Sequence, residues 1–313
     1  MKTVMLTGGR GFLGRSLQPL LREKYNLLAP TSQDCNLMNY AEVNAYLKEN
    51  PVDAIIHSAA FYGGIGINQT EPANIFFRNT VMASNLFEAA AHNQIKQVIP
   101  IGSACAYPGD KHGDLSESDF WAGPLHDSVE AYGFSKKLQH VAQRAYFKQY
   151  GIESNHLILT NMYGPHDDYS DYRSHVVAAL IKRFSVAKVT GKEEVVCWGD
   201  GSPIREFIYV GDAAKLIVNS LELPHSLEPV NIGTGIGTSI RELTELIVEI
   251  VGYKGNVIWD TDKPNGVARK VLDTTRLNSL FPNSEFVELR EGLTRTVEWF
   301  REHLLEEFIH GEN

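Results

Sequence analysis

Tyr132 and Lys136 stand four residues apart, a spacing that places both side chains on one face of a helix. A phenol with a usual pKa of about 10 exchanges protons poorly at neutral pH, and a neighbouring ammonium lowers that pKa because it favours the phenolate. Such a pair can exchange a proton with a carbonyl or hydroxyl oxygen while a hydride moves to or from a nicotinamide. Ser103, about 30 residues upstream, could hydrogen-bond the same oxygen. A solvent-exposed helix pair is the alternative interpretation of the Tyr-x-x-x-Lys spacing alone.

Three glycines form a second candidate site, Gly8-x-x-Gly11-x-x-Gly14, directly after the first apolar run. In a dinucleotide site such glycines permit a tight turn, a close approach of backbone to pyrophosphate and close packing of helix on strand. The pyrophosphate would lie at the positive N-terminal end of the helix. A glycine-rich turn without a ligand is the alternative, but the position between a first strand and a first helix favours dinucleotide binding.

The type of dinucleotide depends on the residues after the second strand. An acid there would hydrogen-bond the adenosine ribose and select NAD. Residues 28–32 contain no acid, and the first one is Asp34. Arg10, inside the glycine loop, could contact a 2′-phosphate, although a loop arginine can also be simply solvated. The sequence therefore predicts NADP(H).

Short apolar runs alternate with amphipathic stretches in the first half of the chain. The candidate strands are 3–7, 26–29, 54–57, 98–101 and 154–159, and the candidate helices are 13–24, 41–50, 73–93 and 132–150. Apolar strands that alternate with helices predict a parallel sheet covered on both faces. The expected fold class is α/β, a Rossmann-type doubly wound parallel sheet with a smaller C-terminal α/β lobe.

Beyond residue 165 the pattern is less regular. A helix is expected from 175, strands near 195 and at 206–209, and helices at 212–221, 240–251 and 290–305. We expect residues 1–165, with returning segments at about 205–235, to form an NADP-binding Rossmann domain. Residues 166–204 and 236–313 are expected to form the substrate-binding lobe.

The composition limits the class of protein. The 313 residues carry a net charge of -9, which argues against a nucleic-acid or membrane-surface partner because either favours a basic face. Three cysteines do not suggest a disulfide framework and indicate a reducing compartment. No apolar run approaches the ~20 residues of a membrane span, and no residues show metal-ligand spacing. The sequence predicts a soluble cytoplasmic protein with no metal site.

Longer sequence motifs surround the candidate residues. They cover residues 63–65, 102–108, 160–167, 174–176, 198–207 and 269–273. Together with the glycine loop and the Ser103, Tyr132 and Lys136 set, they resemble the extended short-chain dehydrogenase/reductase superfamily, also called the NAD-dependent epimerase/dehydratase family. Within it the chain is similar, over essentially its whole length, to the GDP-L-fucose synthases.

The resemblance implies a reaction: NADPH-dependent 3,5-epimerisation and C4 reduction of a GDP-4-keto-6-deoxyhexose. A C4 ketone acidifies the hydrogens on C3 and C5, and fucose synthases invert these carbons with a cysteine and a histidine. The matching residues are Cys105 and His175. Without the family, Cys105 would be a small buried side chain and His175 a surface histidine at a helix start. As a base, the Cys105 thiol would need a lowered pKa.

The resemblance also assigns binding residues. Arg205 and Arg183 would pair with the substrate pyrophosphate, helped by Lys270, because a guanidinium fork suits phosphate oxygens. Asn161 would orient the hexose or the cysteine, and Trp198 would lie near the base or fill core. A homodimer through helices 73–93 and 132–150 is expected for the superfamily. The residues expected to contact the cofactor are Gly8, Arg10, Gly11, Phe12, Leu13, Gly14, Lys136 and His175.

Several residues depart from the fucose-synthase pattern. Gly9 stands where a histidine is usual, Ala104 replaces a second serine, no arginine lies near Ser32, and Phe61 and Tyr62 replace smaller residues. Most of these changes fall in the expected sugar-facing loops. They leave open a dideoxy sugar such as the colitose precursor, a 4-keto-heptose, or reduction without epimerisation.

Other functions remain as alternatives. The runner-up enzyme is a C4 reductase or epimerase acting on another nucleotide-linked 4-keto sugar. A dehydratase is disfavoured because residues 104–106 offer no acid–base carboxylate pair. The non-enzyme alternative is a dinucleotide-sensing regulator, which would be expected to lose Tyr132 or Lys136.

Overall fold

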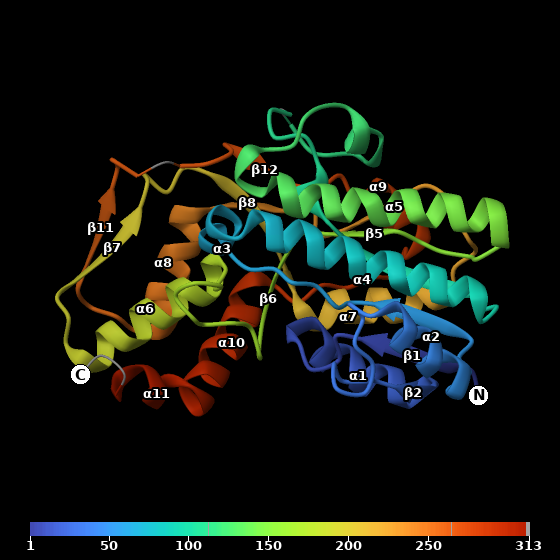
Figure 1. The fold of residues 1–313 in the computed structure, drawn as a ribbon. Helices are drawn as coiled ribbons and strands as arrows, with labels where there is room; N and C mark the ends of the chain where they lie inside the picture. Colours follow the sequence, from blue (N-terminus) through green and yellow to red (C-terminus); the bar gives the residue numbers. More distant parts are fainter. Residues whose placement is uncertain (112, 264, 311–313) are drawn as a thin grey trace.

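A computed structural model describes residues 1–111, 113–263 and 265–310. Figure 1 shows a large sheet layered between helices, with a second group of helices and short strands beside it. The large sheet contains β1 (Thr3–Thr7), β2 (Asn26–Leu28), β3 (Ala54–His57), β4 (Gln97–Ser103), β5 (Leu157–Leu159) and β9 (Val230–Ile232). Its six strands run in the order β2-β1-β3-β4-β5-β9, and all neighbouring strands are parallel.

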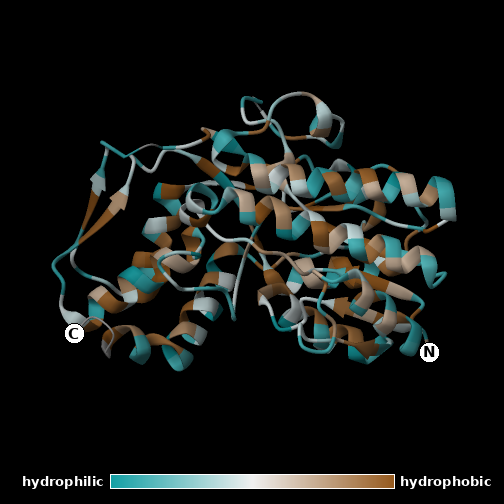
Figure 2. Cartoon of the chain, viewed as in Figure 1, coloured by the Kyte–Doolittle hydropathy of each residue, from teal (hydrophilic) through white to brown (hydrophobic). Residues whose placement is uncertain are grey.

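Alternating side chains of these strands feed two separate cores, because successive residues of a strand point to opposite faces. Val4 and Leu6 pack on one face with Leu17 of helix α1 (Phe12–Lys24), whereas Met5 packs on the other face with Phe87 of helix α4 (Pro72–His92). Figure 2 shows hydrophobic strands between helices of mixed hydropathy. The helices around this sheet are α1 (Phe12–Lys24), α2 (Tyr40–Glu49), α3 (Ile65–Thr70), α4 (Pro72–His92), α5 (Glu130–Tyr150), α7 (Val210–Asn219) and α9 (Thr275–Leu280). The predicted doubly wound α/β fold is confirmed.

The direction of winding reverses at β1, which lies between β2 and β3. In open α/β sheets, ligands bind in the crevice beyond the carboxyl ends of the strands at such a switch point. The glycine loop that follows β1 lies at this point.

The remaining elements form smaller sheets and a helical layer. Their strands are β6 (Asn161–Tyr163), β7 (Glu194–Trp198), β8 (Ile204–Tyr209), β10 (Gly237–Ser239), β11 (Asn256–Asp260) and β12 (Arg269–Lys270), and their helices are α6 (Val176–Thr190), α8 (Ile240–Val251), α10 (Leu289–His303) and α11 (Leu305–His310). β8 pairs with β6, β10 and β12, and β7 pairs with β11. Buried Phe184, Ile247 and Phe300 join α6, α8 and α10 in one core.

The segment expected to return to the first domain is divided between the sheets. β8 belongs to the smaller sheet, α7 packs in the core of α1, and β9 is the edge strand of the large sheet. The proposed domain boundaries stay a prediction. The strands β6, β10, β11 and β12 were missed in the sequence because each pairs with a segment distant in the chain, and β6, β10 and β12 have only two or three residues.

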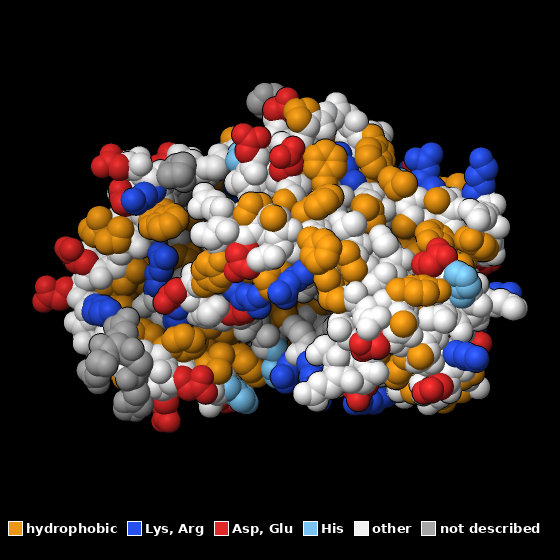
Figure 3. Space-filling model, viewed as in Figure 1, with side chains coloured by type: hydrophobic (Ala, Val, Ile, Leu, Met, Phe, Trp, Pro, Cys, Tyr) orange, Lys and Arg blue, Asp and Glu red, His pale blue; other side chains and the backbone are white. Residues whose placement is uncertain are grey.

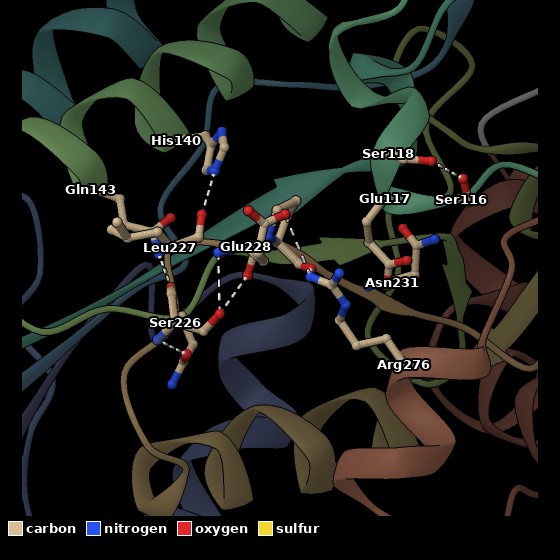
Figure 4. A network of polar contacts seen from close by, with 12 residues as sticks. Ser116, Glu117, Ser118, His140, Gln143, Ser226, Leu227, Glu228, Asn231 and Arg276 are labelled. Carbon is tan, nitrogen blue, oxygen red and sulfur yellow. Dashed lines mark hydrogen bonds and ion pairs between the residues drawn. The ribbon is translucent and has the colours of Figure 1, made fainter.

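A long segment between β4 and α5 carries three short 3-10 helices: residues 104–106, 117–121 and 127–129. A buried polar network holds it, in which the carboxylate of Glu117 accepts a hydrogen bond from the Asn231 backbone at 2.9 Å (Figure 4). In the same view the His140 side chain of α5 bonds the Leu227 carbonyl at 3.0 Å. The first contact fixes this segment to β9, and the second fixes α5 to the loop before β9. Within the described ranges, no helix combines the length and apolarity that a membrane span needs.

Candidate active site

The glycine loop is shaped by two close backbone contacts. Gly8 has a φ of +70°, and a Cβ there would lie 2.8 Å from the backbone of Ala59. A Cβ on Gly14 would lie 2.1 Å from the Gly8 carbonyl oxygen. Gly11 is the N-cap of α1 and supplies no side-chain hydrogen bond, and the first turn contains no acid. The first N–H groups of α1 therefore remain available for an anion such as a pyrophosphate.

The neighbours of the glycines differ in what they offer a cofactor. Leu13 is buried in the core below the loop and Phe12 packs against that core, so Leu13 can offer only its backbone. Arg10 is exposed. Asp34 lies close enough to Arg10 for the arginine to help lower the pKa of that carboxyl, after the hydrogen bonds from Thr31. The sequence indicated Arg10 but not that Asp34 would fold back toward it.

Tyr132 and Lys136 lie together near the start of α5. The Lys136 ammonium lies 5.5 Å from the centre of the Tyr132 ring and donates a hydrogen bond to the Ile101 carbonyl at 2.8 Å. Burial lowers the pKa of Lys136 to about 8. Burial raises the pKa of Tyr132 well above its usual value, Cys105 and Tyr62 add to this rise, and a side-chain hydrogen bond with Ser103 opposes it. The structure thus brings Ser103, Cys105, Tyr132 and Lys136 together.

Cys105 also lies near a pair of cations. Burial lowers the pKa of Arg205, and Cys105 raises it. The Cys105 thiol therefore lies within electrostatic range of the Arg205 guanidinium. Lys270 of β12 is the direct register partner of Arg205 of β8. Partners in neighbouring parallel strands project from the same face of a sheet, so the two cations lie side by side. They are the strongest candidates for binding a diphosphate.

His175 is the N-cap residue of α6 and packs, like Tyr132, against Tyr62. The Tyr62 ring centre is 6.3 Å from that of Tyr132 and 5.6 Å from that of His175. Burial lowers the pKa of His175, and the carboxylate of Asp168 opposes the shift. Burial raises the pKa of Asp167 to about 7, its hydrogen bond from the Asp168 backbone lowers it, and the Asp168 charge raises it.

The other predicted substrate-binding residues have different surroundings. Asn161 donates to the Glu206 carbonyl at 2.9 Å, which joins β6 to β8 beside Arg205. Arg183 is exposed and bonds the Val196 carbonyl at 3.2 Å. Trp198 is 60% exposed at the end of β7, so the interpretation as core filler is wrong. Among the described residues, no group of three or more His, Cys, Asp or Glu could hold a metal ion.

Sequence reasoning did not assign Tyr62 or Asp167 to the site. Tyr62 is one of the departures from the family pattern, directly before the motif at residues 63–65, and Asp167 lies in the motif at residues 160–167. A Tyr replacing a smaller residue next to Gly63 was the available signal for Tyr62. The burial of Asp167 had no signal, because its neighbour Asp168 is exposed and equally acidic.

A family model decides the relationship. The model described as "NAD dependent epimerase/dehydratase family" matches residues 4–233. The chain belongs to this family. The match covers the glycine loop, the Ser103–Cys105 segment, Tyr132, Lys136 and Arg205, so the predicted family is confirmed.

Individual relatives extend over nearly the whole chain. A GDP-L-fucose synthase of Escherichia coli is 35% identical over 311 residues, which cover 96% of this chain and 97% of the relative. A GDP-L-colitose synthase of Yersinia pseudotuberculosis is 33% identical and covers 95% of this chain and 97% of the relative. A solved GDP-mannoheptose C4 reductase of Campylobacter jejuni with NADP bound is 26% identical, with a TM-score of 0.86 and coverages of 96% and 98%. The chain is therefore an enzyme of the epimerase/dehydratase family rather than a member of an unrelated dinucleotide-binding class.

Proposed function

We propose that this enzyme carries out NADPH-dependent 3,5-epimerisation and C4 reduction of a GDP-4-keto-6-deoxyhexose. The observation that carries the proposal is the placement of Tyr132 among Ser103, Cys105 and Tyr62, with His175 also packed against Tyr62. The same site then contains Tyr132, which can donate a proton to an oxygen, and Cys105 and His175, which can exchange protons with carbon. The fucose-synthase and colitose-synthase relatives support this reaction class.

The protein fits a nicotinamide dinucleotide at the glycine loop. Gly8 and Gly14 form a cradle that side chains would fill, and the uncapped start of α1 faces it. Bound NADPH supplies the hydride for C4. Lys136 would hold the nicotinamide ribose and His175 would lie near it, and Arg10 would hold the 2′-phosphate. NADP in the related heptose reductase supports this form of the cofactor.

The reduction needs a proton as well as a hydride. Ser103 would bond the C4 oxygen, and Tyr132 would donate its phenolic proton to that oxygen. Lys136, buried and with its pKa lowered to about 8, then reprotonates the phenolate. The high pKa of Tyr132 keeps the phenol protonated, which is the form that reduction requires.

Epimerisation uses Cys105 and His175. The C4 ketone acidifies the C–H bonds at C3 and C5, so removal of a proton from either carbon gives an enolate. Addition of a proton to the opposite face of that carbon inverts it. The lowered pKa of His175 keeps its imidazole neutral, with one nitrogen able to accept and the other able to donate. Cys105 lies within electrostatic range of Arg205, which places the thiol beside the proposed diphosphate site.

The GDP group would bind in the second lobe. Arg205 and Lys270 would hold its diphosphate, and Asn161 would line the sugar side of Arg205. Arg183 of α6, bonded to β7, and Trp198 at the end of β7 would offer further exposed contacts. Residues 1–165 with the returning segments would form the cofactor domain, and 166–204 with 236–313 the GDP-sugar lobe.

The test is an incubation with GDP-4-keto-6-deoxy-D-mannose and NADPH in deuterated water, followed by mass spectrometry and NMR of the product. Two carbon-bound deuterons with NADPH consumption support the proposal. NADPH consumption without carbon-bound deuterium would leave a C4 reductase and remove Cys105 and His175 from the mechanism. The heptose reductase relative makes a GDP-4-keto-heptose the second substrate to try.

We also propose a homodimer through α4 and α5. Phe76 and Phe77 of α4 and Phe134 and Val141 of α5 are exposed, and apolar side chains gather over these helices in Figure 3. Exposed apolar patches of this kind mark interaction surfaces. Sedimentation analysis should give a dimer for the wild type and a monomer for Val141→Glu.

We further propose a cytoplasmic location, without nucleic-acid or membrane partners. The net charge of -9 and the three unpaired cysteines support this. Cell fractionation with an antibody to the protein tests it.

A further inference from the structure

Tyr62 is the middle ring of an aromatic row between two residues with proposed roles in catalysis. Its ring lies at 26° to that of Tyr132 and at 32° to that of His175, with centre distances of 6.3 and 5.6 Å. Its side chain is partly buried, like those of Tyr132 and His175. All three side chains therefore keep some exposed surface.

The backbone around Tyr62 is held firmly. Buried Asn79 of α4 accepts a hydrogen bond from the Phe61 N–H and donates one to the Phe61 carbonyl, both at 2.8 Å. The Phe61 ring lies between the guanidinium groups of Arg78 and Arg173, at 4.6 and 5.0 Å. These contacts hold the Phe61 ring against the two arginines and fix the backbone from which the next side chain projects.

The segment after Tyr62 is fixed to the second lobe. The Gly64 N–H bonds the Arg173 carbonyl at 2.9 Å. A Cβ on Gly64 would lie 2.5 Å from the Ser174 carbonyl oxygen, directly before His175. Tyr62 and His175 are therefore carried by two segments in backbone contact, so the space between them has little freedom to widen.

The surroundings of the Tyr62 hydroxyl oppose its ionisation. Burial raises the pKa of Tyr62, the charges of Asp167 and Asp168 raise it further, and Arg173 opposes them. The side chain thus acts as a neutral, bulky phenol rather than as a proton-transfer group. Its contribution to the site is space and shape.

This arrangement limits the sugar. In the proposed reaction Tyr132 acts on the C4 oxygen and His175 on a carbon next to C4, so the side chain between them faces the substituents of that neighbouring carbon. C3 carries a hydroxyl in 4-keto-6-deoxyhexoses and 4-keto-heptoses and only hydrogen in a 3,6-dideoxy sugar such as the colitose precursor. C5 carries a methyl group in the 6-deoxy and dideoxy sugars and a longer chain in heptoses. A filled pocket rejects additional atoms at a cost of about 1–3 kcal/mol.

We propose that Tyr62 is a specificity-determining residue whose ring closes the sugar subsite to C5 substituents longer than a methyl group. The inference rests on the proposed function and names its substrate class: GDP-linked 4-keto sugars with a short C5 substituent. The enzyme then discriminates against GDP-4-keto-heptoses by size.

Binding measurements test the proposal without turnover. Isothermal titration calorimetry would compare a GDP-6-deoxyhexose with a GDP-heptose on the NADP-loaded wild type and on Tyr62→Val, with Tyr62→Leu as a second variant should Val unfold the loop. The wild type should bind the 6-deoxyhexose at least ~10-fold more tightly. Removal of the ring should reduce that ratio at least ~10-fold, chiefly by tighter binding of the heptose.

Two matched controls separate size from other causes. Tyr62→Phe keeps the ring and removes the hydroxyl. Phe61→Val shortens the neighbouring side chain, which packs with Arg78 and Arg173. Both variants should keep the wild-type ratio. An unchanged ratio in Tyr62→Val, or an equal change in Tyr62→Phe or Phe61→Val, overturns the proposal. A wild type that binds NADP but neither sugar nucleotide instead overturns the proposed function, and this proposal with it.

Discussion

The two ends of the candidate site are built in different ways. The cofactor end consists of one short run, Gly8–Gly14, whose backbone forms the cradle. The sugar end consists of side chains from β4, α5, β8, β12 and the segments 61–64 and 161–175. A contiguous backbone site needs only one turn to fold correctly, whereas the sugar end needs both groups of elements to pack together.

The two ends also differ in their electrostatics. Arg10 and Asp34 at the cofactor end are exposed, and solvent screens their charges. At the sugar end, burial shifts the pKa of Tyr132, His175 and Asp167. The cofactor end therefore depends on steric fit, and the sugar end on the desolvation of titratable groups.

The steric fit of the cofactor end is most sharply tested by Gly14→Ala. In a helix this substitution usually stabilises by about 1 kcal/mol, but here the new Cβ would lie 2.1 Å from the Gly8 carbonyl oxygen. We expect a loss of about 3 kcal/mol in the free energy of unfolding, together with loss of NADPH binding. Urea unfolding and fluorescence titration with NADPH measure the two effects.

Gly11→Ala is the matched control. Gly11 has an extended backbone, with φ of −76°, and a Cβ would lie 3.3 Å from the same oxygen. We expect a change below about 1 kcal/mol. Equal losses in the two variants would contradict the steric account of the loop.

Tyr132→Phe tests the proton donor of the sugar end. It removes one hydroxyl while the ring and its contact with Tyr62 remain. We expect the rate of NADPH oxidation with a GDP-4-keto sugar to fall about 10³-fold, with the dissociation constant of NADPH unchanged. Tyr150→Phe, on the exposed end of the same helix, should leave the rate as it is. A wild-type rate in Tyr132→Phe would exclude the phenol as the proton donor.

The same contrast explains what the sequence could predict. β1 was predicted as Thr3–Thr7 and is found with those limits, since an apolar core of three residues between two β-branched threonines precedes the glycines. Tyr132 and Lys136 were predicted on one helix face and lie together, since a spacing of four residues is a local property of a helix. Periodicity and spacing are sufficient for features of this kind.

Features that depend on distant pairing were not predicted. The pairing of Lys270 with Arg205 depends on β12, a strand of two residues with no periodic signal. The position of Tyr62 between Tyr132 and His175 depends on contact between segments over 100 residues apart. The departure at Tyr62 was visible in the sequence, but its neighbours were not.

The stability of the sugar end should depend on pH, unlike that of the cofactor end. The pKa of Asp167 is raised by burial to about 7, so the folded protein favours the protonated acid. Stability from this group is fully present below its unfolded pKa, near 4, and is lost as the pH rises through about 7. Asp167→Asn has no titrating carboxyl and therefore does not lose stability in this pH range. The free energy of unfolding of the variant minus that of the wild type should be larger at pH 8 than at pH 4, by on the order of 3 kcal/mol.

Unfolding curves at pH 4, 6 and 8 measure this difference. Asp168→Asn is the control, because Asp168 is exposed beside it. The control also removes a charge that raises the pKa of Asp167, so it should shift the pH dependence slightly without abolishing it. A pH-independent effect of Asp167→Asn would show that its carboxyl is already ionised at pH 4 in the folded protein.

The smallest expected effect returns to the cofactor end. Arg10 is exposed, and a solvent-screened contact between a guanidinium and a 2′-phosphate contributes about 1–2 kcal/mol. Arg10→Ala should therefore weaken NADPH binding about 10-fold and leave NADH binding unchanged, since NADH lacks that phosphate. Asp34, whose charge lies near Arg10, would repel the same phosphate, so Asp34→Asn should tighten NADPH binding by a smaller factor. Titrations at low and high salt separate this from a steric effect, because both changes should shrink as salt screens the charges. If NADH and NADPH bind equally well to the wild type and to both variants, the exposed charges of the cofactor end do not choose the cofactor, and the backbone cradle alone accounts for its binding.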